Sequence, residues 1–138
     1  MTVFYSDLAL SKDYGDMNTP KGVVLASKAV YTVPVSVPQI ADTIQMNPIP
    51  KGAIILDVIL ESDGGNASLT LTVGDGTDAD MFIASFDASA AALKRMDHAG
   101  VGAVGKAYAA AGHVIITTAG AVMVAADVYT CIVTYMMP

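Results

Sequence analysis

Residues 53–73 read AIILDVILESDGGNASLTLTV, and this stretch decides the fold class. Its first nine residues place one apolar face opposite a mixed face when they are read with a period of two. Residues 67–73 alternate apolar side chains with Ser or Thr, which is typical of a strand with one buried face. The intervening SDGGNA is rich in turn-forming residues. The stretch therefore predicts two half-buried antiparallel strands. The expected core positions are Ile54, Leu56, Val58, Leu60, Leu69, Leu71 and Val73.

Working outward, further short apolar and β-branched runs are separated by Gly, Pro and Asp clusters. We expect turns at NPIPKG (47–52) and GDGTDAD (74–80), and a helical turn at 87–96 begun by Asp87 or Ser89. The pattern gives about eight strands with little helix, as in a sandwich or small barrel. An eight-stranded jelly roll is the first expectation, and another Greek-key sandwich is the alternative. The remaining candidate strands are residues 23–33, 39–46, 81–86, 106–110, 113–118 and 127–137.

Residues 1–20 differ from the rest because they mix aromatic, apolar and charged residues without a sustained period and end at Pro20. We interpret them as an extended N-terminal arm that is ordered by lying on a protein surface, and residues 21–138 as the β-sandwich domain. A frayed tail without function is the alternative. Aromatic side chains often dominate interface energies. The candidate interface residues of the arm are Phe4, Tyr5, Leu8 and Tyr14.

The composition points to association with other proteins. The chain has 138 residues, enough for one domain with its own core, and 54% of them are apolar. Only 14% are charged, whereas about a quarter is usual for a soluble domain. Too few charges remain to cover a monomer, so we expect some apolar surface to be buried against other chains. A net charge of −6 and scattered Lys and Arg argue against nucleic-acid binding.

The sequence carries few signals of the cellular compartment in which the protein works. With one cysteine, Cys131, no intrachain disulfide can form, and its apolar alternating surroundings predict a buried, inert thiol. No targeting segment is visible at the start of the sequence. Residues 107–126 carry no formal charge over a length that could cross a bilayer. Gly, His and Thr interrupt this run, and its short β-branched pieces favour strands over a spanning helix.

No pattern of catalytic residues is evident. His98 and His113 have no metal partner at a familiar spacing, and GVGAVG (100–105) lacks the strand and helix that a dinucleotide loop requires. Asp75, Asp78 and Asp80 could in principle bind Ca²⁺, but they do not match an EF-hand loop, and a solvated turn is the favoured interpretation. We therefore expect no enzyme activity and assign no catalytic, cofactor-binding or metal-binding residues.

Several segments of the central third together resemble the decoration, or cement, proteins of tailed-bacteriophage heads. The segments are ADTI at Ala41–Ile44, PKGA at Pro50–Ala53, ILDV at Ile55–Val58, LTL at Leu69–Leu71 and VGDGTDAD at Val73–Asp80. The resemblance implies a jelly-roll-like sandwich, often trimeric, bound to the outside of a capsid shell. The resemblance implies no catalytic residues.

The expected function is that of a structural virion protein which binds the outer surface of a phage head and stabilises it. Its partners would be the major capsid protein and other copies of itself in a homotrimer, and it would be made in the host cytoplasm. It would bind neither nucleic acid nor membrane. The alternative is a receptor- or carbohydrate-binding β module of a phage tail or fibre, and a small enzyme on a β scaffold is a third possibility.

Overall fold

The computed structural model describes residues 2–5, 23–97 and 105–137, and within these ranges every regular element is a strand. No helix in the described ranges is long and apolar enough to cross a membrane. The strands are β1 (Val3–Tyr5), β2 (Val23–Thr32), β3 (Thr43–Ile49), β4 (Ile54–Ser62), β5 (Thr70–Gly74), β6 (Ile83–Asp87), β7 (Ala92–Arg95), β8 (Gly112–Ala119) and β9 (Val128–Met137).

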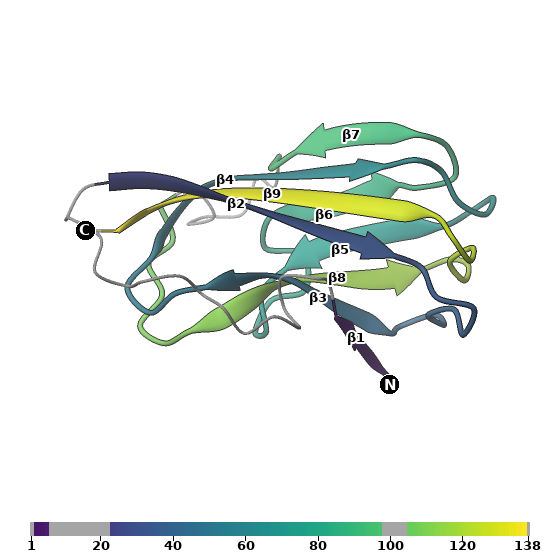
Figure 1. Cartoon of the computed structure of the whole chain (residues 1–138), viewed down its shortest axis with the longest axis horizontal. Coiled ribbons are helices and arrows are strands. Elements are labelled where there is room, and N and C mark those ends of the chain that lie inside the picture. The colour runs from purple at the N-terminus through teal and green to yellow at the C-terminus, as the bar shows by residue number, and fades with distance from the viewer. Residues whose placement is uncertain (1, 6–22, 98–104, 138) are drawn as a thin grey trace.

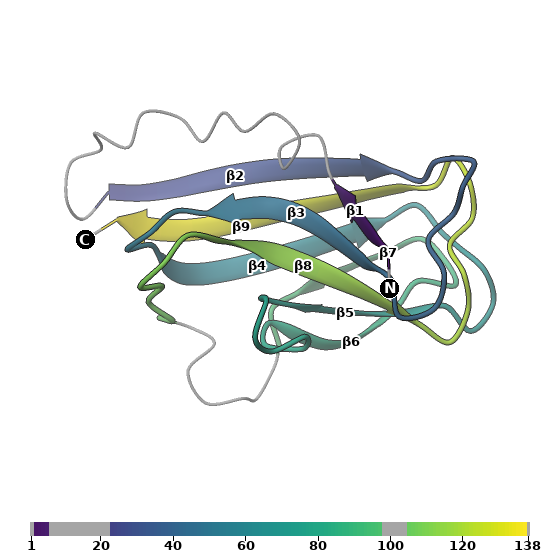
Figure 2. The same cartoon turned by 90° about the horizontal axis from the view of Figure 1, so that it is seen from below.

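Strands β2 to β9 form a jelly roll, which confirms the first expectation from the sequence. Four antiparallel pairs are nested in the chain: β2 with β9, β3 with β8, β4 with β7, and β5 with β6. This nested hairpin is rolled up so that β9 also pairs with β4, and β8 with β5. The result is a four-stranded sheet in the order β2-β9-β4-β7 facing a five-stranded sheet in the order β1-β3-β8-β5-β6 (Figures 1 and 2).

β1 is the one strand outside this jelly-roll pattern. Its residues pair in parallel with β3, from Val3 opposite Thr43 to Tyr5 opposite Gln45. β1 and β2 therefore belong to different sheets. The first residues of the expected arm thus extend the edge of the five-stranded sheet.

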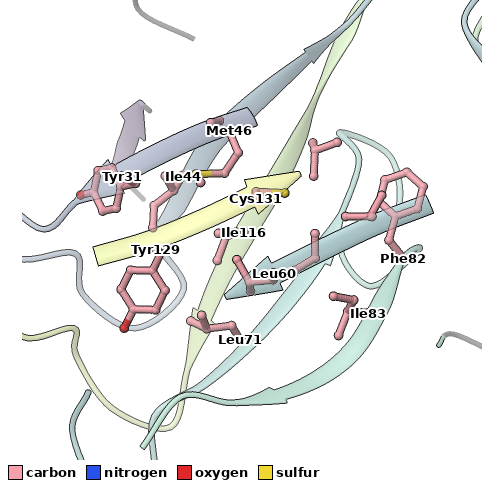
Figure 3. Packing of buried hydrophobic residues seen from close by; sticks show 14 of the residues in the cluster. Tyr31, Ile44, Met46, Leu60, Leu71, Phe82, Ile83, Ile116, Tyr129 and Cys131 are labelled. Atoms are coloured by element: carbon pink, nitrogen blue, oxygen red, sulfur yellow. The ribbon is translucent and has the colours of Figure 1, made fainter. Parts of the chain in front are cut away.

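The core lies between the two sheets and is built from the inward positions of each strand (Figure 3). Leu69, Leu71 and Val73 are fully buried, as their alternation with polar residues predicted. Cys131 also has no exposed surface, and burial raises the pKa of its thiol to about 12. Its predicted burial is confirmed.

The predicted core face of β4 is correct in the second half of the strand and wrong in the first half, because the strand contains a β-bulge. Val58 and Leu60 are buried as expected, but Ile55 is fully buried where Ile54 was expected. The pairing with β9 shifts register between Ile55 and Asp57, which adds one residue to β4. Such an extra residue reverses the alternation on its N-terminal side, and a strict period of two cannot reveal it.

Three local predictions need correction. The turn at 47–52 begins later than predicted, because β3 continues to Ile49 and accommodates Pro48 at a register shift, where a missing N–H is tolerated. The helical turn at 87–96 is wrong: Asp87 accepts hydrogen bonds from Ser89, but a turn and then β7 follow. The strand at 106–110 is reduced to one isolated bridge between Ala107 and Ile54.

Candidate interaction surfaces

The outer face of the four-stranded sheet is unusually apolar. Val24 at one edge is 57% exposed and Leu93 at the other edge is 62% exposed. Between them, apolar side chains occupy outward positions of every strand and are partly exposed. The pairing registers of β2, β9, β4 and β7 place these side chains side by side on one surface. Its apolar members are Val24, Ala26, Val30, Val128, Ile132, Met136, Ile54, Ile59 and Leu93. We call this surface the four-strand face.

Four charged residues interrupt the four-strand face. Arg95 on β7 forms an ion pair with Asp57 on β4, and the Arg95 Nε to Asp57 Oδ2 distance is 3.0 Å. Lys28 on β2 and Glu61 on β4 lie on opposite sides of β9 and are both exposed. Two positive and two negative charges make this face neutral overall, although the whole chain carries a net charge of −6.

The outer face of the five-stranded sheet has a different character, because its central positions carry no formal charge. Thr43, Thr117 and Thr72 form one row across β3, β8 and β5. Gln45 and Ile115 form the next row. β1 extends both rows with Val3 and Tyr5. A neutral surface of Thr, Gln and Tyr can donate and accept hydrogen bonds without the desolvation cost of burying a charge.

The sequence predicted four interface residues in the arm, and the structure places two of them. Phe4 points inward and meets Tyr31 of β2 edge to face, with ring centroids 6.4 Å apart. Tyr5 points outward and is 44% exposed. Leu8 and Tyr14 lie outside the described residues. Neighbouring aromatic residues therefore have opposite surroundings, one against the chain's own core and one available at the surface.

Asp42 fixes the start of β1. Its Oδ1 accepts a hydrogen bond from the Thr2 backbone N–H at 2.8 Å, and its Oδ2 accepts one from the Gln39 N–H, also at 2.8 Å. These two hydrogen bonds, that of Thr2 first, hold the pKa of the Asp42 carboxyl below its usual range. A carboxylate thus joins the N-terminal strand to the loop before β3.

One end of the sandwich carries exposed apolar loop tips. Val35 is 94% exposed and Ile40 is 56% exposed in the β2–β3 loop, and Val124 is 36% exposed in the β8–β9 loop. Backbone hydrogen bonds hold the two loops together, including Val33 N–H to Asp127 O at 2.9 Å. The loops at residues 33–42, 63–69, 88–91 and 120–127 contain no Lys or Arg. This end is therefore apolar and acidic.

The acidic turn at residues 75–80 is stabilised by its own hydrogen bonds. Asp75 Oδ1 accepts hydrogen bonds from Thr77 and from the Asp78 N–H, and Asp75 Oδ2 accepts one from the Tyr108 hydroxyl at 2.8 Å. Burial alone would raise the pKa of Asp75, but these hydrogen bonds hold it below its usual value. The Asp75 carboxylate thus already has protein donors on both oxygens. Nowhere in the described ranges do three or more His, Cys, Asp or Glu residues gather to hold a metal.

A shallow hollow lies at the opposite end, between residues 48–51 and 111–113. Its lining is Pro48, Ile49, Pro50, Lys51, Ala111, Gly112 and His113. Burial lowers the pKa of His113, so its imidazole is uncharged at neutral pH. None of these lining residues is Phe, Tyr or Trp, but an adjoining hollow that shares residues 111–113 is also lined by Tyr108.

The four-strand face was not identified from the sequence, although residues 127–137 contained the signal. Both faces of that stretch hold apolar residues: Tyr129, Cys131 and Val133 are buried, while Ile132 and Met136 point outward. A strand that is apolar on both sides needs two surfaces to cover it. Among the residues that the structure describes, the inner side of β9 is covered by the opposite sheet, while Ile132 and Met136 on its outer side stay partly exposed.

Comparison with known proteins shows what kind of fold this is. No family model matches the sequence, and no curated protein matches it. Among solved structures, a chain in the capsid of Ralstonia phage GP4 is similar with a TM-score of 0.83 and 18% identity, over 99% of this chain and 99% of that one.

Two further structures are similar. A chain in the capsid asymmetric unit of cyanophage Pam1 has a TM-score of 0.62 and 24% identity, over 92% of this chain and 96% of that one. A chain in the acid-stable capsid of Helicobacter pylori bacteriophage KHP30 has a TM-score of 0.59 and 15% identity, over 86% and 91%. The protein thus has a jelly-roll fold that also occurs in chains of phage capsids.

Proposed function

We propose that this protein is a structural component of a bacteriophage virion, and specifically a decoration protein that binds the outer surface of the head and stabilises it. The observation that carries this proposal is the likeness to a chain of the Ralstonia phage GP4 capsid over 99% of both chains. That match covers the whole sandwich and not a fragment of it. The matched chain is therefore a single jelly roll of similar length, like this one.

The proposed mechanism is burial of apolar surface between proteins. Copies associate with one another as homotrimers and contact the major capsid protein, covering the charge-poor surfaces described above. Each Å² of buried apolar area contributes about 25 cal/mol before the costs of association. A trimer contacts several shell subunits together, so weak single contacts add through avidity. Opening a seam in the shell would then require these contacts to be broken.

The arm supplies part of the shell contact in this proposal. Of the two described aromatic arm residues, Tyr5 is the one exposed to a partner, because Phe4 already packs on Tyr31. Leu8 and Tyr14 remain proposed anchors. The acidic, apolar loop end is suited to a basic patch on a shell subunit, since opposite charges guide the approach of two proteins.

The function is tested with phage heads that lack this protein. We expect purified protein to co-sediment with such heads and to raise the temperature at which they release their DNA. Failure to bind, or binding without any gain in head stability, would reject the decoration role. A glycan array run in parallel tests the receptor-binding alternative, and specific binding of one sugar class would favour that alternative.

The role of the arm is tested by two neighbouring substitutions. Tyr5→Ala should weaken head binding and leave the melting temperature of the free protein unchanged, because the Tyr5 ring is exposed. Phe4→Ala is the matched variant and should lower the melting temperature, because the Phe4 ring contacts Tyr31. If Tyr5→Ala binds heads with full affinity, Tyr5 is not an anchor.

A further inference from the structure

The four-strand face has a charge pattern that is complementary to itself. Its β2 side carries Lys28, and its β4 side carries Glu61. β9 lies between the two strands and presents Thr130 and Ile132 outward. From sheet geometry, the Cα atoms of Lys28 and Glu61 are about 12 Å apart within one chain. Lys28 is therefore surrounded by apolar and threonine side chains, while Glu61 has Arg95, which is already paired with Asp57, diagonally across on β7.

Within the part of the chain that the structure describes, neither charge takes part in an ion pair. The ion pairs seen there join Arg95 to Asp57 and Lys94 to Asp97. Covering the face with an apolar partner would desolvate Lys28 and Glu61 without any compensating contact. A suitable partner presents a negative group opposite Lys28 and a positive group opposite Glu61. In a trimer of this chain, one neighbouring copy presents Glu61 to Lys28 and the other neighbouring copy presents Lys28 to Glu61.

The size of the face also suits a protein partner. Its two longest strands have ten residues each. The other two have nine and four residues, so at about 3.3 Å per residue and about 4.8 Å between strands the sheet covers a flat area on the order of 500 Å², to which side-chain relief adds. A stable interface buries roughly 800 Å² on each partner. The face can therefore supply more than half of the area that such an interface buries on each copy.

We propose that copies of this chain associate through the four-strand face, with the β2 side of each copy packed on the β4 side of the next around the trimer, so that Lys28 of one copy faces Glu61 of the next. The apolar residues of β9 and β4 are buried at the contact. This inference rests on the self-association that the proposed function includes. It assigns that association to the four-strand face and to the Lys28–Glu61 pair.

Charge reversal tests this contact with the full-length protein in solution. The mass of the wild type, measured by light scattering over a dilution series, should exceed that of a monomer. Lys28→Glu places two negative groups opposite each other, and Glu61→Lys places two positive groups there. Each single variant should dissociate at concentrations at least tenfold higher than the wild type does. The double variant K28E/E61K should recover the associated mass.

Mixing the two single variants separates a contact between chains from one within a chain. Each single variant presents like charges to its own copies but opposite charges to the other variant. An equimolar mixture should therefore recover part of the associated mass, because a mixed trimer has two opposite-charge contacts and one like-charge contact, whereas either variant alone has three like-charge contacts. Lys51→Glu and Asp80→Lys, at the far end of the sandwich, make the same charge changes as controls and should leave the mass unchanged. Circular dichroism confirms that every variant is folded.

A monomeric wild type would overturn the proposal, as would a mixture that shows no recovery. Equal dissociation of the control variants would also overturn it, because the effect would then follow net charge and not position. Head binding is measured separately. A wild type that associates through this face but does not bind heads would reject the proposed function and leave the contact between copies standing.

Discussion

At the scale of single residues, Asn47 connects the two sheets. It is fully buried on β3, and its Nδ2 donates hydrogen bonds to the Ser27 carbonyl at 3.0 Å, to Ser27 Oγ at 3.0 Å and to the Cys131 carbonyl at 3.2 Å. These acceptors lie on β2 and β9 of the opposite sheet. Asn47 thus supplies hydrogen-bond donors to acceptors of the opposite sheet, which an apolar residue at this position could not do.

We expect Asn47→Ala to lower the free energy of unfolding by about 1–3 kcal/mol, because the Ser27 and Cys131 carbonyls lose a buried donor. Urea denaturation measures this change. Gln45→Ala is the matched control on the same strand, since Gln45 points to the outer face and should have little effect. Equal losses in the two variants would mean that the link between sheets adds nothing to stability.

Asp127 is a residue whose ionisation opposes folding. Burial first and the nearby Asp63 carboxylate second raise its pKa above the ordinary value of 3.8. The folded state therefore holds this proton more tightly than the unfolded chain does. The contribution of Asp127 to stability is therefore lost as the pH rises from the ordinary pKa through the higher folded pKa.

Asp127→Asn should accordingly raise the melting temperature at pH 7, and the gain should disappear below about pH 3.8, where the carboxyl is protonated in both states. Asp80→Asn removes the same formal charge from the β5–β6 turn and serves as control. Thermal melts of both variants between pH 3 and 7 test this. A gain that does not depend on pH would show that the Asp127 charge is not its cause.

At the scale of elements, β1 depends on a single carboxylate. The Asp42 carboxylate accepts hydrogen bonds from both Thr2 and Gln39, and its pKa is lowered for that reason, with Thr2 as the first cause. A lowered carboxyl pKa contributes stability that is present above the ordinary value of 3.8 and is lost as the pH falls through the folded pKa.

Asp42→Asn replaces one acceptor oxygen with an N–H group that faces another donor. We expect β1 to open more often, so that the amides of residues 3–5 exchange with solvent roughly tenfold faster, as loss of a typical hydrogen bond would allow. Lowering the pH of the wild type below the Asp42 pKa should likewise speed exchange at β1 relative to exchange at β5, because acid slows the intrinsic exchange of both strands alike. Unchanged exchange at β1, with β5 as internal reference, would contradict this role.

The sequence predicts strands well where alternation is uninterrupted. Leu69, Leu71 and Val73 were placed correctly because a residue with period-two neighbours can face only one way. The prediction failed at Ile54 and Ile55, because the bulge in β4 depends on pairing with β9, about 80 residues later. It also ended β3 too early, since Pro48 is compatible with a strand only where the neighbouring strand shifts register.

The same limit applies to the candidate surfaces. Low charge content predicted that some face would be apolar, but not which face. Lys28 and Glu61 are 33 positions apart in the sequence, and they share a surface only because β9 inserts between β2 and β4. Pairings between strands this distant are set by the rolled topology and leave no local signal. The sequence therefore predicted that an apolar surface exists, whereas the residues that form it are known only from the structure.

At the scale of the whole molecule, β1 and β9 contribute unequally to the stability of the fold. β1 pairs only with β3 at the edge of its sheet. β9 lies between β2 and β4, and it places Tyr129, Cys131 and Val133 in the core. The outermost pair of the nested hairpin joins Val23 to Met137, so the sheet containing β9 cannot be completed until the last residues are available. Such distant pairings slow folding.

We therefore expect a chain of residues 21–138 to unfold cooperatively, with a melting temperature a few degrees below that of the full chain, since loss of each kcal/mol costs on the order of 4 °C in a domain of this size. The Phe4–Tyr31 contact and the β1–β3 pairing account for this loss. A chain of residues 1–127 should not fold, because β2 and β4 lose their shared neighbour. Circular dichroism melts of both truncations test the boundary. If residues 21–138 alone gave no cooperative transition, the arm would belong to the folding unit, and the division of the chain at residue 20 would be wrong.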